Sequence, residues 1–326
     1  MTLKVRQLGS GQYSDCFKVS DGMGRAVALK VSYYRDSTIR AVTSHVEHGD
    51  IAAASTVMDQ DAVSVATSIA AVAMTMKQHN VTPHIVVVYG DADAPDVPAR
   101  LAPLLNARLP SLTPRQFKYS HLCVMELCAC TMKTFVASSA LATDRVTRCL
   151  IFQVLYTLAC LQRVLPGFRH NDLSANNVLV RRLPQPLTTT YVISGNKIAR
   201  MHNMTVAVAL ADFDFTHVPH HSILANERIL GKKYGIGQEA NEGYDTHLFL
   251  ASLKKAVGAQ ERHKGRLDKT RAFLECIKLG STSRTHTRAA HLDPMRLMMH
   301  PYFDVLFSGA DAGPAKVGET YIMPST

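Results

Sequence analysis

The sequence predicts an α+β protein in two parts, the first rich in strands with one large helix and the second mainly helical. Three observations support this. Short alternating apolar runs separated by glycines fill the first 31 residues, a stretch rich in Ala, Val and Met from residue 52 to 78 keeps helical spacing, and a wide apolar stripe follows residue 144. At 326 residues the chain is also long enough for two domains or lobes.

The composition is that of a folded globular chain. Hydrophobic residues make up 47% and charged residues 19% of the sequence. There is no apolar run of about 18 residues, so we expect no membrane span. The first residues lack the apolar centre of a signal peptide, and the seven cysteines have no regular spacing. We therefore expect an intracellular protein with reduced thiols.

The net charge of +10 is unevenly distributed. Between residues 253 and 300, eleven Lys and Arg residues stand against four Asp and Glu residues. Such a surface could attract acidic protein substrates. Aromatic residues for base stacking are nearly absent there, so we do not expect nucleic-acid binding. A solvated helical face is the plainer interpretation of the same charges.

The stretch with the clearest chemistry is residues 169–180, RHNDLSANNVLV. It places Asp172 five positions before Asn177, just ahead of an apolar Val-Leu-Val that predicts a short buried strand. In a loop of that length the two side chains can converge, one to accept a proton and the other to hold a metal that carries phosphate. An ordinary turn that enters a strand is the alternative, because Asn and Asp are common turn residues.

A second motif lies near the start of the chain, where Gly9, Ser10 and Gly11 precede Tyr13 and an alternating segment. Glycine lets the backbone approach a bound anion closely. A returning strand over residues 26–31 then carries Lys30, which is costly to bury without an opposite charge.

The remaining elements are expected from periodicity and turn residues. After the helix at 52–78, these are a turn and strand at 81–89, an irregular insertion at 91–114, a strand at 121–125, a helix capped by Thr143 or Asp144, an extra hairpin around 191–196, a buried strand at 206–211, and a helix from Tyr244.

Taken in order, these features resemble a protein kinase. The glycine hairpin and Val-Ala-Leu-Lys30 resemble the glycine-rich loop and its lysine strand, residues 169–180 resemble the catalytic loop, and Asp212-Phe213-Asp214 resembles the metal-binding Asp-Phe-Gly. The resemblance implies a bilobal kinase-like fold and is nearest to the serine/threonine kinases of large DNA viruses. It also implies that Asp245 ties down the backbone of the catalytic loop, although a helix N-cap is an equal alternative.

The resemblance implies a role for each site residue. Asp172 would orient and deprotonate the acceptor hydroxyl, Asn177 and Asp212 would hold Mg²⁺, and Lys30 would bind the phosphates of ATP. Gly9, Ser10, Gly11 and Tyr13 would form the cradle over the nucleotide. Glu126 and Cys128 would belong to the hinge at 126–128, which follows the gatekeeper Met125 and binds the adenine.

The sequence departs from the kinase pattern at several positions. The large helix has no Glu to pair with Lys30, and Asp61 is our candidate for that role. Asn171 replaces the Arg that reads activation-loop phosphorylation, so we expect activity without that modification. Asp214 replaces the Gly of Asp-Phe-Gly, and Ser174 stands where serine kinases commonly have Lys. No Ala-Pro-Glu triplet lies between residues 214 and 245.

These features predict an ATP- and Mg²⁺-dependent serine/threonine protein kinase acting on a protein hydroxyl, in the host cytoplasm, nucleus or virion if it is viral. A small-molecule kinase of the choline or aminoglycoside type and a pseudokinase that serves as a binding scaffold remain alternatives. We expect an ATP-binding N-lobe at 1–127, a catalytic C-lobe at 128–307 and a flexible tail at 308–326.

Overall fold

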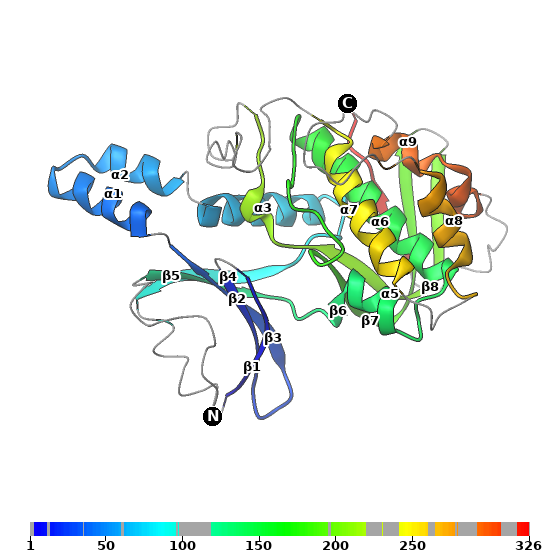
Figure 1. The fold of residues 1–326 in the computed structure, drawn as a ribbon, viewed down its shortest axis with the longest axis horizontal. Helices are drawn as coiled ribbons and strands as arrows, with labels where there is room; N and C mark the ends of the chain where they lie inside the picture. Colours follow the sequence, from blue (N-terminus) through cyan, green and yellow to red (C-terminus); the bar gives the residue numbers. More distant parts are fainter. Residues whose placement is uncertain are drawn as a thin grey trace. The chain divides into compact units, whose positions relative to one another are not determined.

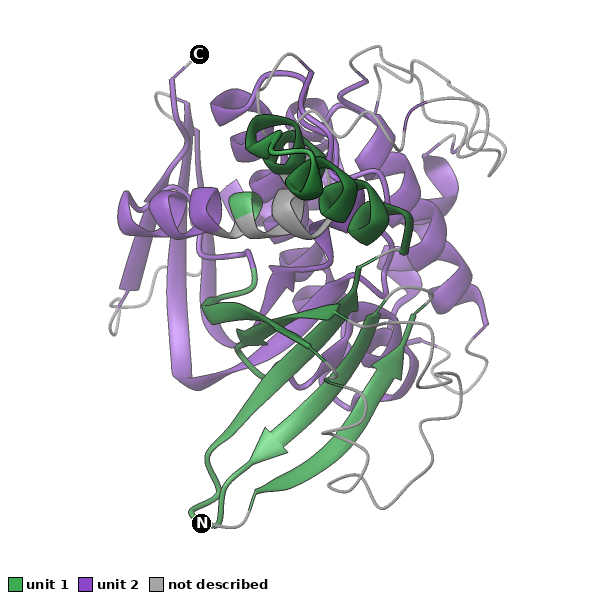
Figure 2. Cartoon of the chain, turned by 90° about the vertical axis from the view of Figure 1, so that its left-hand side faces the viewer, with its two compact units in different colours: residues 1–70, 86–127 green, residues 71–85, 128–326 purple. Residues whose placement is uncertain are grey.

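The computed structural model describes residues 3–11, 14–34, 36–59, 62–95, 97, 119–194, 197–219, 230, 241–259, 265–277, 279, 292–307 and 318–325. The chain forms two compact units, one of residues 1–70 and 86–127 and the other of residues 71–85 and 128–326 (Figure 2). The boundary at 70/71 falls inside one helix, so residues 71–85 group with the C-terminal unit rather than with the N-terminal part of the sequence.

The first unit contains a five-stranded antiparallel sheet with the order β1-β2-β3-β5-β4. Its strands are β1 (Lys4–Ser10), β2 (Ser14–Ser20), β3 (Ala26–Tyr33), β4 (Val88–Pro95) and β5 (Tyr119–Met125) (Figure 1). The predicted hairpin of the first 31 residues and the strand at 121–125 are confirmed. The strand expected at 81–89 begins only at Val88, and it continues to Pro95, into the stretch expected to be irregular.

The β2–β3 hairpin owes its turn to Asp21. Its Oδ1 accepts from the backbone N–H of Met23 and of Arg25, both at 2.9 Å, and Gly24 adopts a φ of 81°. Only glycine takes this backbone conformation readily. The flanking strands then alternate, and one face buries Phe17, Val31 and Tyr33 with Val97.

The helices between residues 36 and 78 differ from the prediction of one helix over 52–78. The structure has α1 (Asp36–Glu47), which was not predicted, then α2 (Ile51–Asp59) and α3 (Ala62–Gln78). Residues 60 and 61, between α2 and α3, lie outside the described residues, and they include Asp61, the candidate partner of Lys30.

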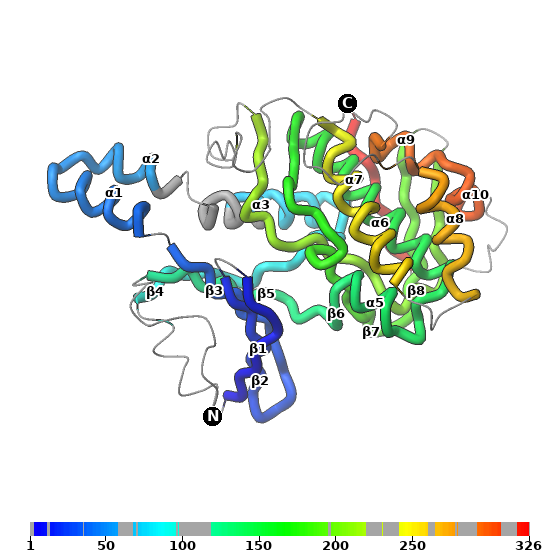
Figure 3. The backbone as a smooth tube through the Cα atoms, in the orientation of Figure 1, coloured from blue at the N-terminus to red at the C-terminus, as the bar shows by residue number. Residues whose placement is uncertain are grey.

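The second unit is mainly helical, as predicted, and is organised around α6 (Asp144–Val164), almost every residue of which from Thr147 to Leu161 is buried. Thr143 caps this helix by accepting from the Val146 N–H at 3.3 Å, which confirms the predicted start. The other helices are α5 (Met132–Ser138), α7 (Tyr244–Gly258), α8 (Asp268–Cys276), α9 (Pro294–Met298) and α10 (Asp304–Phe307), with 3-10 turns η1 (Phe213–Phe215) and η5 (Pro301–Phe303) (Figures 1 and 3).

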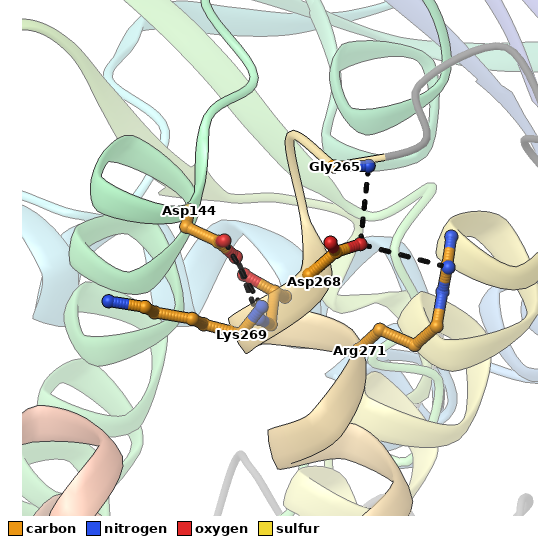
Figure 4. A network of polar contacts seen from close by, with 6 residues as sticks. Asp144, Gly265, Asp268, Lys269 and Arg271 are labelled. Atoms are coloured by element: carbon orange, nitrogen blue, oxygen red, sulfur yellow. Dashed lines mark hydrogen bonds and ion pairs between the residues drawn. The ribbon is translucent and has the colours of Figure 1, made fainter.

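A network of polar contacts joins α6 to α8 (Figure 4). The Asp144 carboxylate accepts from the backbone N–H of Lys269 at 3.1 Å and of Thr270 at 2.7 Å. Asp268 accepts from the Gly265 N–H at 3.3 Å and lies 4.0 Å from Arg271. The Asp144 carboxylate thus satisfies N–H groups in the first turn of α8 that have no partner inside the helix.

The second sheet is a long hairpin with two short flanking strands. β7 (Val178–Ser194) pairs antiparallel with β8 (Lys197–Leu210) and with β6 (Cys130–Thr131). The buried strand before Asp212 is confirmed as the end of β8. The hairpin expected around 191–196 is not a separate one, because β7 and β8 pair with each other from Val178 and Leu210 to Ser194 and Lys197, and residues 195 and 196 lie outside the described residues.

The end of the chain differs from the expected flexible tail. Residues Gly318–Ile322 form β9, which runs parallel to β7, and Tyr321 and Met323 are buried there. β9 pairs with backbone groups that the edge of β7 would otherwise leave open, and the burial of Tyr321 and Met323 adds apolar contacts. Residues 308–317 lie outside the described residues.

The predicted α+β class is thus confirmed, with a sheet-rich N-terminal part and a largely helical C-terminal part. Among the described residues, no helix is both long and apolar enough to cross a membrane.

Candidate active site

The loop that carries Asp172 is held at its start by a backbone pairing with the segment after η1. Arg169 and His217 exchange both backbone hydrogen bonds, at 3.0 and 2.9 Å. Asn171 then adopts the left-handed conformation with a φ of 64°, and its Nδ2 donates to the Phe215 carbonyl at 2.9 Å. Asn tolerates this conformation better than most residues. The Asn in place of the usual Arg therefore shapes the loop.

The two residues predicted to converge do so. The Asn177 amide nitrogen donates to the Asp172 carboxylate at 3.0 Å and to the Asp172 carbonyl at 2.7 Å. Because Nδ2 donates both bonds, Oδ1 is the amide atom that can coordinate a cation. Residues 174–177 also form a turn that enters β7, as in the alternative interpretation, so the two side chains converge across that turn.

The third residue of the predicted set, Asp212, comes from the end of β8. The backbone N–H of Ala211 donates to the Asn177 carbonyl at 2.9 Å, and His170 Nε2 lies 3.0 Å from the Ala211 carbonyl. The next residue, Asp212, has a φ of 68° and a ψ of 62°. A strained conformation at a non-glycine residue is common at functional sites. Asp172, Asn177 and Asp212 therefore lie on adjoining, directly bonded segments of the second unit.

Beneath this loop, α7 supplies the buried Asp245. Its two carboxylate oxygens accept from the backbone N–H groups of His170 at 2.7 Å and of Asn171 at 2.8 Å. The predicted tether is confirmed, and the N-cap alternative is wrong, because the N-cap is Gly243 and no side-chain bond caps the helix. Burial raises the pKa of Asp245, while His170, the two N–H bonds and Arg169 oppose that rise.

These residues suit an oxygen-coordinated ion. One amide oxygen and one carboxylate are the donor types that Mg²⁺ prefers, and Mg²⁺ is commonly held by one or two protein groups together with substrate phosphates. Among the described residues, no group of three or more His, Cys, Asp or Glu side chains is placed to hold a metal ion by itself.

In the first unit, Gly9 and Lys30 lie in one row across the sheet. Gly9 pairs with Cys16, Cys16 with Lys30, and Lys30 with Cys123. A Cβ at Gly9 would meet no atom within 4 Å, so this glycine is not required by packing. Its surroundings leave room for a ligand to approach the strand.

The turn between β1 and β2 is closed by the Gly11 N–H, which donates to the Ser14 carbonyl at 2.7 Å. Ser10 ends β1, while Tyr13 lies outside the described residues. The structure thus places Gly9, Ser10 and Lys30 in one sheet, with Gly11 directly after the end of β1.

The predicted hinge begins within the first unit. Glu126 exchanges two bonds with Val87, its N–H donating to the Val87 carbonyl and its Oε1 accepting from the Val87 N–H, each at 2.9 Å. Cys128 begins the second part of the other unit, and Ala129 after it donates to the Val180 carbonyl at 2.8 Å. The Glu126 side chain is thus engaged with the protein backbone, and a role for these residues in nucleotide binding remains a prediction.

Sequence reasoning missed Asp15, which is 2% exposed. Its carboxylate accepts from the Tyr33 hydroxyl at 2.7 Å and from the Gln7 amide at 3.1 Å, so it ties β1, β2 and β3 together beside the glycine turn. Burial, and then the hydrogen bond to Asp15, raise the pKa of Tyr33. The alternation of residues in β2 could have indicated that Asp15 is buried, because it places Asp15 on the same face as the buried Phe17.

Comparisons with known proteins find similarity to viral serine/threonine protein kinases. A family model described as poxvirus serine/threonine protein kinase matches residues 116–308. A protein of Acanthamoeba polyphaga mimivirus named "Putative serine/threonine-protein kinase" is 32% identical over 110 residues. That match covers 32% of this chain and 23% of the mimivirus protein, so the chain aligns with less than a quarter of that relative's length.

Among solved structures, the crystal structure of the PF14_0431 kinase domain aligns with 77% of this chain and 62% of its own at 13% identity. The TM-score is 0.37.

Proposed function

Because the chain belongs to the poxvirus serine/threonine protein kinase family, we propose that it transfers the terminal phosphoryl group of ATP to a serine or threonine hydroxyl of a protein. The family match covers more than half of the chain and includes every site residue of the second unit. The observation that carries the proposal is the pair of bonds from Asn177 to Asp172, beside the segment that delivers Asp212.

In this proposal, Asp172 accepts the proton of the acceptor hydroxyl as its oxygen bonds to the terminal phosphorus and the bond to the leaving ADP oxygen breaks. Asn177 keeps the carboxylate of Asp172 oriented through Nδ2 and presents Oδ1 to the metal. Asp212 provides the second metal ligand. Mg²⁺ would neutralise the charge of the transferring phosphates.

The first unit would bind the nucleotide. The backbone of Gly9, Ser10 and Gly11 is suited to lie over the phosphates, and Lys30 would pair with them. Tyr13 would cover the nucleotide from the tip of the loop, and the segment Glu126–Cys128 would bond to the adenine. These roles rest on the order of the motifs and on family membership.

The direct test is phosphoryl transfer by the purified full chain. With labelled ATP and Mg²⁺, we expect label on casein or histone and none on choline or an aminoglycoside. Asp172→Ala should lower the rate by about 10² to 10⁴-fold, which is the usual contribution of a general base. Asp268→Ala, which removes an exposed carboxylate of α8, serves as the control.

The outcomes separate the alternatives. Label on the small molecule alone would indicate a small-molecule kinase. Failure of ATP with Mg²⁺ to raise the melting temperature, together with absence of transfer, would indicate a scaffold, because a ligand that binds only the native state must stabilise it.

A further inference from the structure

A second polar contact joins α7 to the loop of Asp172, seven residues beyond Asp245. The Ala175 N–H donates to the hydroxyl of Ser252 at 2.7 Å, and that hydroxyl donates to the Phe249 carbonyl at 2.8 Å. Seven residues are two helical turns, so Asp245 and Ser252 lie on the same face of α7. The helix therefore holds the loop on both sides of Asp172, at residues 170–171 and at residue 175.

The peptide groups of Ala175 are fixed from two directions. Its N–H is bound by Ser252 of α7, and its carbonyl accepts from the Lys133 N–H in the first turn of α5 at 2.9 Å. Ala175 itself is 1% exposed, so water has little access to replace a lost partner. A buried N–H without a partner is unfavourable, and the loop would have to shift to satisfy it.

The same residue sits in the turn that sets the distance between the two catalytic side chains. The Asn177 N–H donates to the Ser174 carbonyl at 2.9 Å, so residues 174–177 form a four-residue turn with Ala175 at its second position. Asn177 ends this turn and reaches back to Asp172. A displacement at Ala175 is thereby passed to the amide that orients the catalytic carboxylate.

We infer that Ser252 is a positioning residue for phosphoryl transfer, which acts through the Ala175 N–H to set the placement of Asn177 against Asp172. The inference rests on the proposed function for its kinetic consequence. A displacement of about 1 Å in such a group can lower a rate by up to about 10²-fold, while substrate binding at other contacts is kept. Loss of Ser252 should therefore lower kcat much more than it changes KM.

The experiment measures kcat and KM for ATP and casein with the full chain carrying Ser252→Ala, Ser252→Thr or Ser138→Ala. We expect about a tenfold lower kcat for Ser252→Ala, KM changes below about twofold, and recovery to within about threefold of wild type with Ser252→Thr, which keeps a hydroxyl able to bond the preceding turn. Ser138 is the matched control, because its hydroxyl bonds only the Thr134 carbonyl within α5, at 2.9 Å.

A second pair of variants separates positioning from a loss of folding. Asn177→Ala removes the amide through which the tether is proposed to act. In the Asn177→Ala background, Ser252→Ala should lower the remaining kcat by less than about twofold, since the group that Ser252 positions is already absent. A full tenfold loss in that background, or an unchanged kcat for Ser252→Ala alone, would overturn the inference. Wild-type protein that transfers no phosphoryl group would instead refute the proposed function. In that case, hydrogen exchange at the Ala175 amide would test the tether on its own. Equal protection of this amide in the wild type and in Ser252→Ala would show that the Ser252 hydroxyl does not hold it.

Discussion

The amide nitrogen of Asn177 lies 3.0 Å from the carboxylate of Asp172, five residues earlier in the chain. A second bond from the same nitrogen, to the Asp172 carbonyl at 2.7 Å, fixes both the backbone and the side chain of the aspartate. The site is therefore preorganised on one side, with the carboxylate already directed by a neighbour before any substrate arrives. Preorganised polar groups lose little energy to rearrangement during reaction.

The first prediction concerns this pair. Asn177→Ala should lower kcat by about 10²-fold or more, because it removes both the orientation of Asp172 and one oxygen ligand for Mg²⁺. The Mg²⁺ concentration that gives half-maximal rate should rise as well. The control is Asn176→Ala, at an exposed position one residue earlier. A Mg²⁺ requirement that is unchanged in Asn177→Ala would exclude Asn177 as a metal ligand.

The second prediction concerns the anchor of the loop. Asp245→Ala leaves the N–H groups of His170 and Asn171 buried without their acceptor, and each bond to a charged group contributes about 1.5 to 3 kcal/mol. We expect a loss of roughly 3 kcal/mol or more in the free energy of unfolding, together with loss of transfer activity. Urea unfolding measures the first quantity. The same change at the exposed Asp304 should cost less than about 0.5 kcal/mol.

Much of the second unit followed from the sequence, because local signals and long-range contacts agree there. Thr143 caps α6 as expected, the apolar stripe of that helix is buried, and Asp245 meets the loop that the motif predicted. These features depend on short stretches with strong periodicity or turn chemistry. Spacing alone was enough to predict that Asp172 and Asn177 converge, since the two residues share one loop.

Other features depend on partners that are remote in sequence. Nothing local indicates that Ser252 binds the Ala175 N–H, which lies 77 residues earlier. The pairing of β9 with β7 was missed because a segment rich in Gly, Ala and Pro has a weak strand signal until an open edge is available. The division into α2 and α3 was missed because apolar residues rich in Ala, Val and Met continue on both sides of the polar residues 59–61.

The third prediction concerns pH. His84 is buried, its Nδ1 lies 3.3 Å from the Val208 carbonyl, and its Nε2 lies 2.7 Å from the Tyr191 hydroxyl. The carbonyl can only accept, so Nδ1 carries the proton and Tyr191 donates to Nε2. Burial, with Arg181 nearby, lowers the pKa of His84 to about 3.

The sign of the effect follows from that lowered value. The unfolded chain takes up a proton at His84 near pH 6.5, whereas the folded chain stays neutral there, so the folded state loses stability as the pH falls from about 6.5 toward 3. Between pH 6.5 and 5 this group should contribute a loss of up to roughly 2 kcal/mol in unfolding free energy. Urea unfolding at pH 6.5 and at pH 5 should give a smaller loss of unfolding free energy for His84→Gln than for the wild type. For His79→Gln, at an exposed site, the loss should be the same as in the wild type. Equal pH dependence in His84→Gln and wild type would contradict the assignment.

The fourth prediction concerns the end of β9, where buried and exposed side chains alternate. Tyr321 and Met323 are 6% and 5% exposed, whereas Ile322 between them is 58% exposed. The Tyr321 ring stacks on Tyr191 with centroids 6.0 Å apart, and the backbone of the segment bonds β7 and the Asn80 carbonyl. Tyr321→Ala should therefore lower the free energy of unfolding by about 3 kcal/mol, the usual result of removing a large buried aromatic side chain. Ile322→Ala should change it by less than about 0.5 kcal/mol, because the side chain is largely in solvent. If both variants unfold at the same urea concentration, the segment does not pack on the second unit through this face, and the tail would be the flexible one that its composition suggested.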